Sequence, residues 1–148
     1  MGSTLGMLVD RVSFDIERGK IAEFARATFA QDPAHTDRNA AALRGFEDVL
    51  ATGTHVVVAG HQRDQQAVVR SLGLDLPRVV VGSTRWEYER PLVAGDRLTA
   101  VRSVVADETK EGKRGGRLRI LTLETEYLDR DAQCVLRQRE VLIERGSA

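Results

Sequence analysis

Four segments in the second half of the chain, rich in β-branched residues or alternating apolar with polar side chains, constrain the fold most. They cover residues 78–88, 96–106, 118–129 and 133–144. Because alternation places successive side chains on opposite faces of a sheet, each segment is predicted to be a strand. Turn-forming residues separate them, namely Pro91 with Gly95 and Asp96, Gly112 with Gly115 and Gly116, and residues 129–131. Four consecutive strands joined by short turns predict an antiparallel meander.

The first half of the chain favours helices instead. Apolar residues recur at helical spacing between Ile21 and Phe29, which predicts an amphipathic helix over residues 17–29 with Asp15 as its cap. Pro33 ends this helix, because a proline disfavours helical geometry in the residue before it. A short second helix is predicted over residues 37–46.

A longer helix is predicted over residues 53–72, ending where Gly73 supplies a left-handed residue. The run of three valines at residues 56–58 would equally suit the start of a strand. Helices followed by strands predict the α+β class, with the long helix packed on one face of the sheet.

Length and composition exclude several classes of protein. A chain of 148 residues is predicted to form one domain, residues 1–148, which buries about 68–70% of its unfolded surface without a disulfide or metal. The 22 basic residues are balanced by 22 acidic ones, which argues against nucleic-acid binding. No apolar run approaches the roughly 20 residues of a membrane span, and no secretory signal opens the chain, so we expect no membrane association and a cytoplasmic location.

The cysteine and histidine pattern does not favour a metal site. Cys134 is the single cysteine, so an intramolecular disulfide and a multi-cysteine zinc site are excluded. His55 and His61 are six residues apart, whereas two ligands on one helical face are four apart. No metal is predicted.

Two places carry side chains or backbone groups suited to catalysis. His35 follows the first predicted helix, between Asp32 and Asp37, and could act as a general base or orient a water; the alternative is an exposed loop histidine beside two acids. Gly53 and Thr54 open the long predicted helix, where unpaired N–H groups and the helix dipole can polarise a carbonyl; simple capping is the alternative.

Residues 110–119 form a strongly basic turn between two predicted strands. It is either a solvated hairpin tip or a basic lip for the phosphates of coenzyme A or the acidic face of an acyl carrier protein. A phosphate-binding loop is excluded, because Asp107 stands where its first glycine should be.

Several of these segments together resemble a known family. Phe-Ala-Arg-Ala-Thr at 24–28 followed by Asp-Pro-Ala-His-Thr-Asp at 32–37 resembles the active-site segment of the MaoC-like R-specific enoyl hydratases. Val-Leu-Ala-Thr-Gly at 49–53 resembles the entry to that family's central helix, and residues 85–100 resemble its strand–turn–strand signature RPV-x-x-GD-x-L. The resemblance spans residues 14–145. The branch it resembles most is the N-terminal FAS1-like dehydratase domain, to which accessory subunits of mycobacterial 3-hydroxyacyl-carrier-protein dehydratases belong.

The resemblance implies a hot-dog fold, in which an antiparallel sheet wraps around a long central helix, here residues 53–72. It implies side-by-side pairing, as a homodimer or as a heterodimer with another hot-dog subunit. It also implies trans-2-enoyl or (3R)-3-hydroxyacyl thioesters of coenzyme A or acyl carrier protein as substrates, without a cofactor.

The resemblance also assigns roles to single residues. His35 matches the catalytic histidine, and Gly53 matches the glycine whose N–H polarises the thioester carbonyl. The catalytic aspartate of active relatives, five residues before the histidine, is replaced by Ala30, and Asp32 stands where they usually carry asparagine. Because alanine cannot accept a proton, loss of one member of the pair is expected to cost about 10²–10⁴ in rate.

Three interpretations follow from this departure at position 30. The chain is a catalytically degenerate subunit that binds the acyl chain and pairs with an active hot-dog partner. Alternatively it is a self-sufficient homodimeric enoyl-CoA hydratase using His35 with Asp32. The third interpretation is a non-enzymatic module that binds acyl thioesters.

Overall fold

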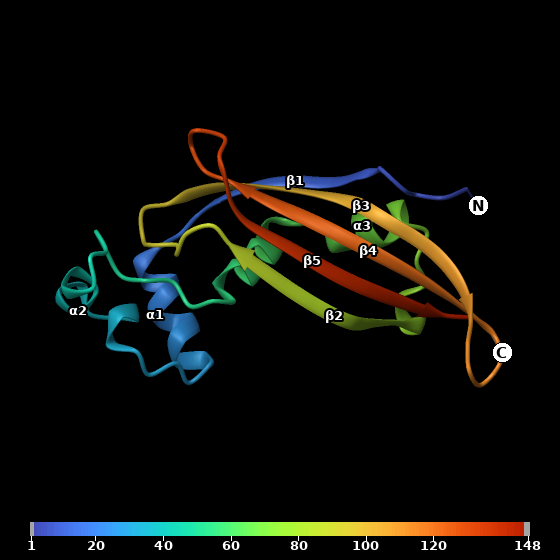
Figure 1. Cartoon of the computed structure of the whole chain (residues 1–148), viewed down its shortest axis with the longest axis horizontal. Helices are drawn as coiled ribbons and strands as arrows, with labels where there is room; N and C mark the ends of the chain where they lie inside the picture. Colours follow the sequence, from blue (N-terminus) through green and yellow to red (C-terminus); the bar gives the residue numbers. More distant parts are fainter. Residues whose placement is uncertain (1, 147–148) are drawn as a thin grey trace.

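The computed structural model describes residues 2–146, and its main element is a twisted five-stranded antiparallel sheet (Figure 1). The order across the sheet is β1-β3-β4-β5-β2. The strands are β1 (Leu8–Asp15), β2 (Val79–Tyr88), β3 (Arg97–Glu111), β4 (Arg117–Leu128) and β5 (Cys134–Arg145). The four predicted strands are therefore confirmed, with β3 running five residues further than expected, whereas β1 was not predicted.

The predicted four-strand meander is wrong for β2. The last three strands do follow one another through tight turns, but β2 pairs with β5 and not with β3. The reason is that β1 occupies the other side of β3, with Phe14 opposite Leu98. The segment between β2 and β3 therefore carries the chain from one edge of the sheet toward the other.

The helices are short and lie in two groups. Figure 1 shows α1 (Arg18–Ala27) and α2 (Arg38–Leu43) at one end of the sheet, opposite the β3–β4 turn. The remaining helical elements are the 3-10 helices η1 (Pro33–His35), η2 (His55–Gln62) and η3 (Leu76–Arg78), and the α-helix α3 (Gln65–Ser71). The first two predicted helices are confirmed in shortened form. The predicted cap is wrong, because Glu17 precedes α1 and Asp15 ends β1 and pairs with Arg97 at 2.9 Å.

The long central helix predicted over residues 53–72 is broken into η2 and α3. Arg63 between them has an extended backbone (φ −99°, ψ 140°), and the Asp64 side chain caps α3 by accepting the Ala67 N–H at 2.9 Å. The Arg63 side chain contacts Asp10 of β1, with 3.2 Å between Nε and Oδ2. This inward ion pair and the new cap account for the break. The helical interpretation of residues 56–58 is confirmed, and Gly73 is left-handed (φ 64°) as expected.

The core consists of two apolar clusters separated by a polar row. The larger cluster includes Phe14, Ile21 and Tyr127, and the smaller one includes Leu72 and Val104. Between them, residues paired across neighbouring strands form a row over the whole sheet. Its polar members, in order of the strands, are Asp10, Arg102, Thr125 and Gln138, and on β2 the row ends at Trp86, which packs against the larger cluster.

Candidate active site

The turn after α1 positions the segment that carries Ala30 and His35. Phe29 adopts a left-handed conformation (φ 57°), and the Ala30 N–H donates to the Ala25 carbonyl at 2.8 Å. The chain thus reverses at the end of α1 and enters η1. Position 30, at this reversal, carries only a methyl group.

His35 is buried, so the exposed-loop alternative is wrong. Its side chain and backbone are 8% exposed, and Nδ1 lies 2.6 Å from the Leu50 carbonyl oxygen. The Leu50 N–H in turn donates to the Ala34 carbonyl at 2.9 Å. Because a carbonyl oxygen only accepts, Nδ1 is protonated, and in the neutral ring Nε2 is then the nitrogen with the lone pair. The imidazole is therefore held in the tautomer that can accept a proton at Nε2.

The Asp32 carboxylate is committed to local contacts. One oxygen accepts the Ala34 N–H at 2.9 Å, and the other accepts from Arg44 Nη1 at 2.5 Å. The backbone N–H and then the Arg44 guanidinium lower the pKa of Asp32, so this group stays ionised near neutral pH. The other nearby acid, Asp37, caps α2 through the Asn39 N–H at 2.8 Å. Asp32 thus holds the turn around His35.

The segment that carries Leu50 is fixed on its other side by residues 91–96. The Ala51 N–H donates to the Leu92 carbonyl at 2.8 Å, and the Ala94 N–H donates to the Val49 carbonyl at 3.0 Å. A bidentate ion pair joins the ends of residues 90–96. Arg90 Nη1 and Nη2 lie 2.9 and 3.1 Å from the two Asp96 carboxylate oxygens. The RPV-x-x-GD-x-L signature therefore has a positioning role, which its spacing alone did not indicate.

Gly53 and Thr54 lie at the entry to η2, as expected. Tyr88 of β2 donates its hydroxyl to the Gly53 carbonyl at 2.5 Å, while the Thr54 side chain makes no capping bond. Within residues 2–146, neither the Gly53 nor the Thr54 N–H is bonded to a backbone or side-chain acceptor. A Cβ built on Gly53 would meet nothing within 4 Å. The N–H groups are thus available to a carbonyl that approaches from outside.

Tyr88 is a residue of the candidate site that the sequence did not reveal, because its alternation with Glu87 and Glu89 suggested a buried strand face shared with Trp86. Only Trp86 of this pair packs against the core, and Tyr88 is 37% exposed. Burial of its hydroxyl, followed by the neighbouring Tyr127, raises the pKa of Tyr88 to about 12. The phenol therefore remains a donor to Gly53 at neutral pH.

His55 is a second buried histidine beside this entry. It is fully buried, and its ring meets Phe24 of α1 edge-on, with 5.5 Å between centroids. Burial, and then the charge of Lys20, lower the pKa of His55 to about 4. Neither ring nitrogen has a hydrogen-bond partner among the described residues. The imidazole is therefore neutral at physiological pH.

An open cleft lies next to His55, between α1 and η2. Its volume is about 300 Å³. The apolar residues Phe24, Ala27, Val57 and Val58 line it together with Lys20, Glu23 and His61. Over residues 2–146 there is no group of three or more His, Cys, Asp or Glu side chains that could hold a metal, and no helix long and apolar enough to cross a membrane.

Comparisons with known proteins identify the family. Residues 3–138 match the model of the FAS1-like dehydratase domain region. A UPF0336 protein of Clavibacter michiganensis is 37% identical over 132 residues, which are 88% of this chain and 85% of that protein.

Two solved complexes from Mycobacterium tuberculosis contain a similar fold. A chain of the C-terminally truncated HadBC (3R-hydroxyacyl-ACP dehydratase) complex is 24% identical with a TM-score of 0.82, covering 96% of this chain and 98% of that one. A chain of the ChsH1–ChsH2 complex is 15% identical with a TM-score of 0.78, covering 96% and 86%. The chain therefore has the hot-dog fold and belongs to the FAS1-like dehydratase family.

Proposed function

We propose that this chain is a catalytically degenerate subunit of a (3R)-3-hydroxyacyl-thioester dehydratase or trans-2-enoyl-thioester hydratase. It binds the acyl chain and pairs with an active hot-dog subunit. One observation carries the proposal: His35 Nδ1 is bonded to the Leu50 carbonyl, which leaves Nε2 for proton transfer, while position 30 is an alanine at the reversal after α1.

The reaction needs two polar groups around one water. Hydration places the water oxygen on C3 of the enoyl chain and a proton on C2, and dehydration is the reverse. His35 Nε2 can take or return one proton, and the Gly53 N–H can stabilise the enolate-like charge on the thioester carbonyl. Position 30 carries no carboxylate, and the Asp32 carboxylate is occupied by Ala34 and Arg44. The chain thus offers half of the acid–base pair.

The free edge of the sheet supports pairing with another subunit. β2 is the last strand in the sheet order, so within residues 2–146 one side of its ten residues has no neighbouring strand. Exposed apolar side chains gather on and beside it, namely Leu76, Val80, Val81 and Tyr88. An exposed edge with apolar residues favours strand-to-strand association. The HadBC and ChsH1–ChsH2 structures, each a complex of two named proteins, are consistent with a different hot-dog subunit as the partner.

The cleft between α1 and η2 supports binding of an acyl chain. Its apolar wall of Phe24, Val57 and Val58 lies next to His55, two residues after Gly53. A volume of about 300 Å³ is at the lower end of small-molecule sites, which suits a short acyl segment.

Restoring the missing acid tests the proposal. We expect Ala30→Asp in the purified chain to raise hydration of a short trans-2-enoyl-CoA by about 10²-fold or more over the wild type. The double variant Ala30→Asp/His35→Ala should lose this gain. The proposal loses its main support if Ala30→Asp is folded, as judged by circular dichroism, and hydrates the substrate no faster than the wild type.

A self-sufficient hydratase is the second candidate, and the buried His35 with its fixed tautomer favours it. In that case the Asp32 carboxylate must release the Arg44 guanidinium and bind the catalytic water instead. We then expect turnover by the wild type alone and its loss in both His35→Ala and Asp32→Asn.

A further inference from the structure

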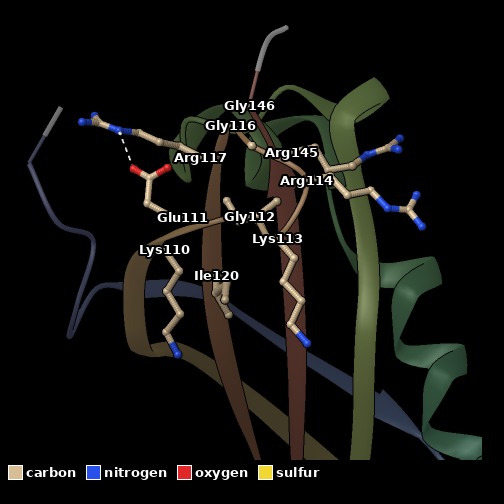
Figure 2. A pocket seen from close by; sticks show the side chains of 12 residues that line it. Lys110, Glu111, Gly112, Lys113, Arg114, Gly116, Arg117, Ile120, Arg145 and Gly146 are labelled. Atoms are coloured by element: carbon tan, nitrogen blue, oxygen red, sulfur yellow. Dashed lines mark ion pairs between the residues drawn. The ribbon is translucent and has the colours of Figure 1, made fainter.

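The turn between β3 and β4 gathers positive charge at the end of the sheet opposite α1 and α2 (Figure 1). We call this the basic hairpin, and it consists of Lys110, Lys113, Arg114 and Arg117 with Arg145 of β5. Figure 2 shows Lys110 and Lys113 extending together along the strands, and Arg114 and Arg145 projecting toward another side. Gly115 and Gly116, both left-handed (φ 83° and 80°), give the turn its shape.

Part of this charge is not neutralised. Glu108 lies 3.2 Å from Lys110, and Glu111 lies 3.9 Å from Arg117. Lys113 and Arg114, both exposed, have no ion-pair partner in residues 2–146. These two side chains are therefore available to an anionic partner.

The basic hairpin cannot serve this chain's own His35. β3 has 15 residues, which span about 50 Å at roughly 3.3 Å per residue. Its first residue lies beside α1, since the Ile16 N–H donates to the Asp96 carbonyl at 2.8 Å. The hairpin begins where β3 ends. Nearly the whole length of the sheet separates it from the candidate active site.

Pairing through β2 would change this relation. The Tyr88 end of β2 contacts Gly53, whereas its other end pairs Val79 with Glu144, next to Arg145 of the basic hairpin. If two hot-dog subunits join through an antiparallel pair of their β2 strands, the Tyr88 end of one β2 lies beside the Val79 end of the other. The active-site end of the partner subunit then lies at the same end of the joined sheet as this chain's basic hairpin.

We propose that the basic hairpin docks the acidic face of an acyl carrier protein, whose thioester enters the active site of the partner subunit. The proposal rests on the function proposed above. An open surface with cations pointing in different directions suits a protein face. A nucleotide such as the one in coenzyme A would need a surface for its base, and none of the described residues that line this depression of about 980 Å³ is aromatic. Leu118 and Ile120 are its large apolar residues.

Binding to the full chain tests the docking surface without requiring activity. The probe is a purified acyl carrier protein bearing phosphopantetheine, titrated into the wild type and into Lys113→Glu/Arg114→Glu. We expect the double variant to bind at least about tenfold more weakly. Arg11→Glu is the control, because Arg11 is exposed on β1 opposite Val101, ten residues before the end of β3, and it should change binding less than about twofold. At an ionic strength of about 1 M, where the screening length is about 3 Å, wild-type binding should be lost.

Two results would overturn the proposal. One is equal binding of the carrier protein by the wild type and the double variant. The other is binding of free coenzyme A that depends on Lys113 and Arg114 while the carrier protein does not bind. Both can occur in a chain that gains hydratase activity through Ala30→Asp, so failure of the docking surface is distinguishable from failure of the proposed function.

Discussion

The Asp10 carboxylate pairs with two buried guanidinium groups, and removing its charge should lower the stability of the fold. Arg102 contacts it through Nη2 at 2.6 Å and through Nε at 3.2 Å, and Arg63 approaches it at 3.2 Å. The exposed fractions of these side chains are 15% for Asp10, 10% for Arg102 and 8% for Arg63. The cluster lies at the break between η2 and α3. Asp10 therefore compensates charge inside the fold and holds the break in place.

Asp10→Asn removes the negative charge without leaving a cavity. Removing one partner of a buried ion pair costs about 3–5 kcal/mol, because the remaining charge is left uncompensated. Since the amide oxygen still accepts one hydrogen bond, we expect a loss near the lower limit, about 3 kcal/mol. Urea unfolding followed by circular dichroism measures this loss as the change in extrapolated free energy of unfolding.

Asp15→Asn is the matched control on the same two strands. Asp15 pairs with Arg97 across β1 and β3 just as Asp10 pairs with Arg102, but its side chain and that of Arg97 are 54% and 50% exposed. An exposed ion pair contributes about 0–1 kcal/mol, so Asp15→Asn should lower the free energy of unfolding by less than about 1 kcal/mol. If Asp10→Asn costs no more than Asp15→Asn, the reasoning about the buried cluster is refuted.

Three further predictions concern the surroundings of the site. Folding lowers the pKa of His55 from 6.5 to about 4, so the unfolded chain binds an extra proton and the free energy of unfolding should decline as the pH falls from about 6.5 toward about 4. His55→Phe should reduce this pH dependence, measured as the urea midpoint across that range. An unchanged pH dependence in the variant would contradict the lowered pKa of His55. Tyr88→Phe removes the bond to the Gly53 carbonyl and should lower the free energy of unfolding by about 1 kcal/mol, whereas a neutral result would show that the bond is dispensable. Gly95 has φ 97°, so Gly95→Ala should destabilise by about 1–2 kcal/mol in the same assay, and no loss would mean that the turn relaxes.

Local signals in the sequence predicted the elements formed by neighbouring residues. The glycines at the β3–β4 turn, the left-handed Gly73 and the alternation in β3, β4 and β5 all act within a few residues. The placement of β2 beside β5 depends on β1, because Phe14 occupies the position opposite Leu98. The break at Arg63 depends on Asp10, 53 positions earlier in the chain. Neither distant partner is visible in the local pattern.

The candidate site shows the same division. The resemblance assigned roles to His35 and Gly53, but the hydrogen bond that orients the His35 ring is accepted by the Leu50 carbonyl, 15 residues further along. Tyr88 reaches Gly53 from 35 residues away. The occupation of Asp32 by Arg44 depends on the turn between α1 and α2. Contacts of this kind determine whether a carboxylate is available to the water, and the sequence left that question open.

The most direct test of the central claim is hydration of a short trans-2-enoyl-CoA by the purified wild-type chain alone, measured beside His35→Ala. A folded chain with Ala30 in place of the acid is expected to show no turnover above that of the His35→Ala variant. Turnover by the wild type that disappears in His35→Ala would contradict the account, because the chain would then be a complete hydratase in which another group supplies the missing carboxylate.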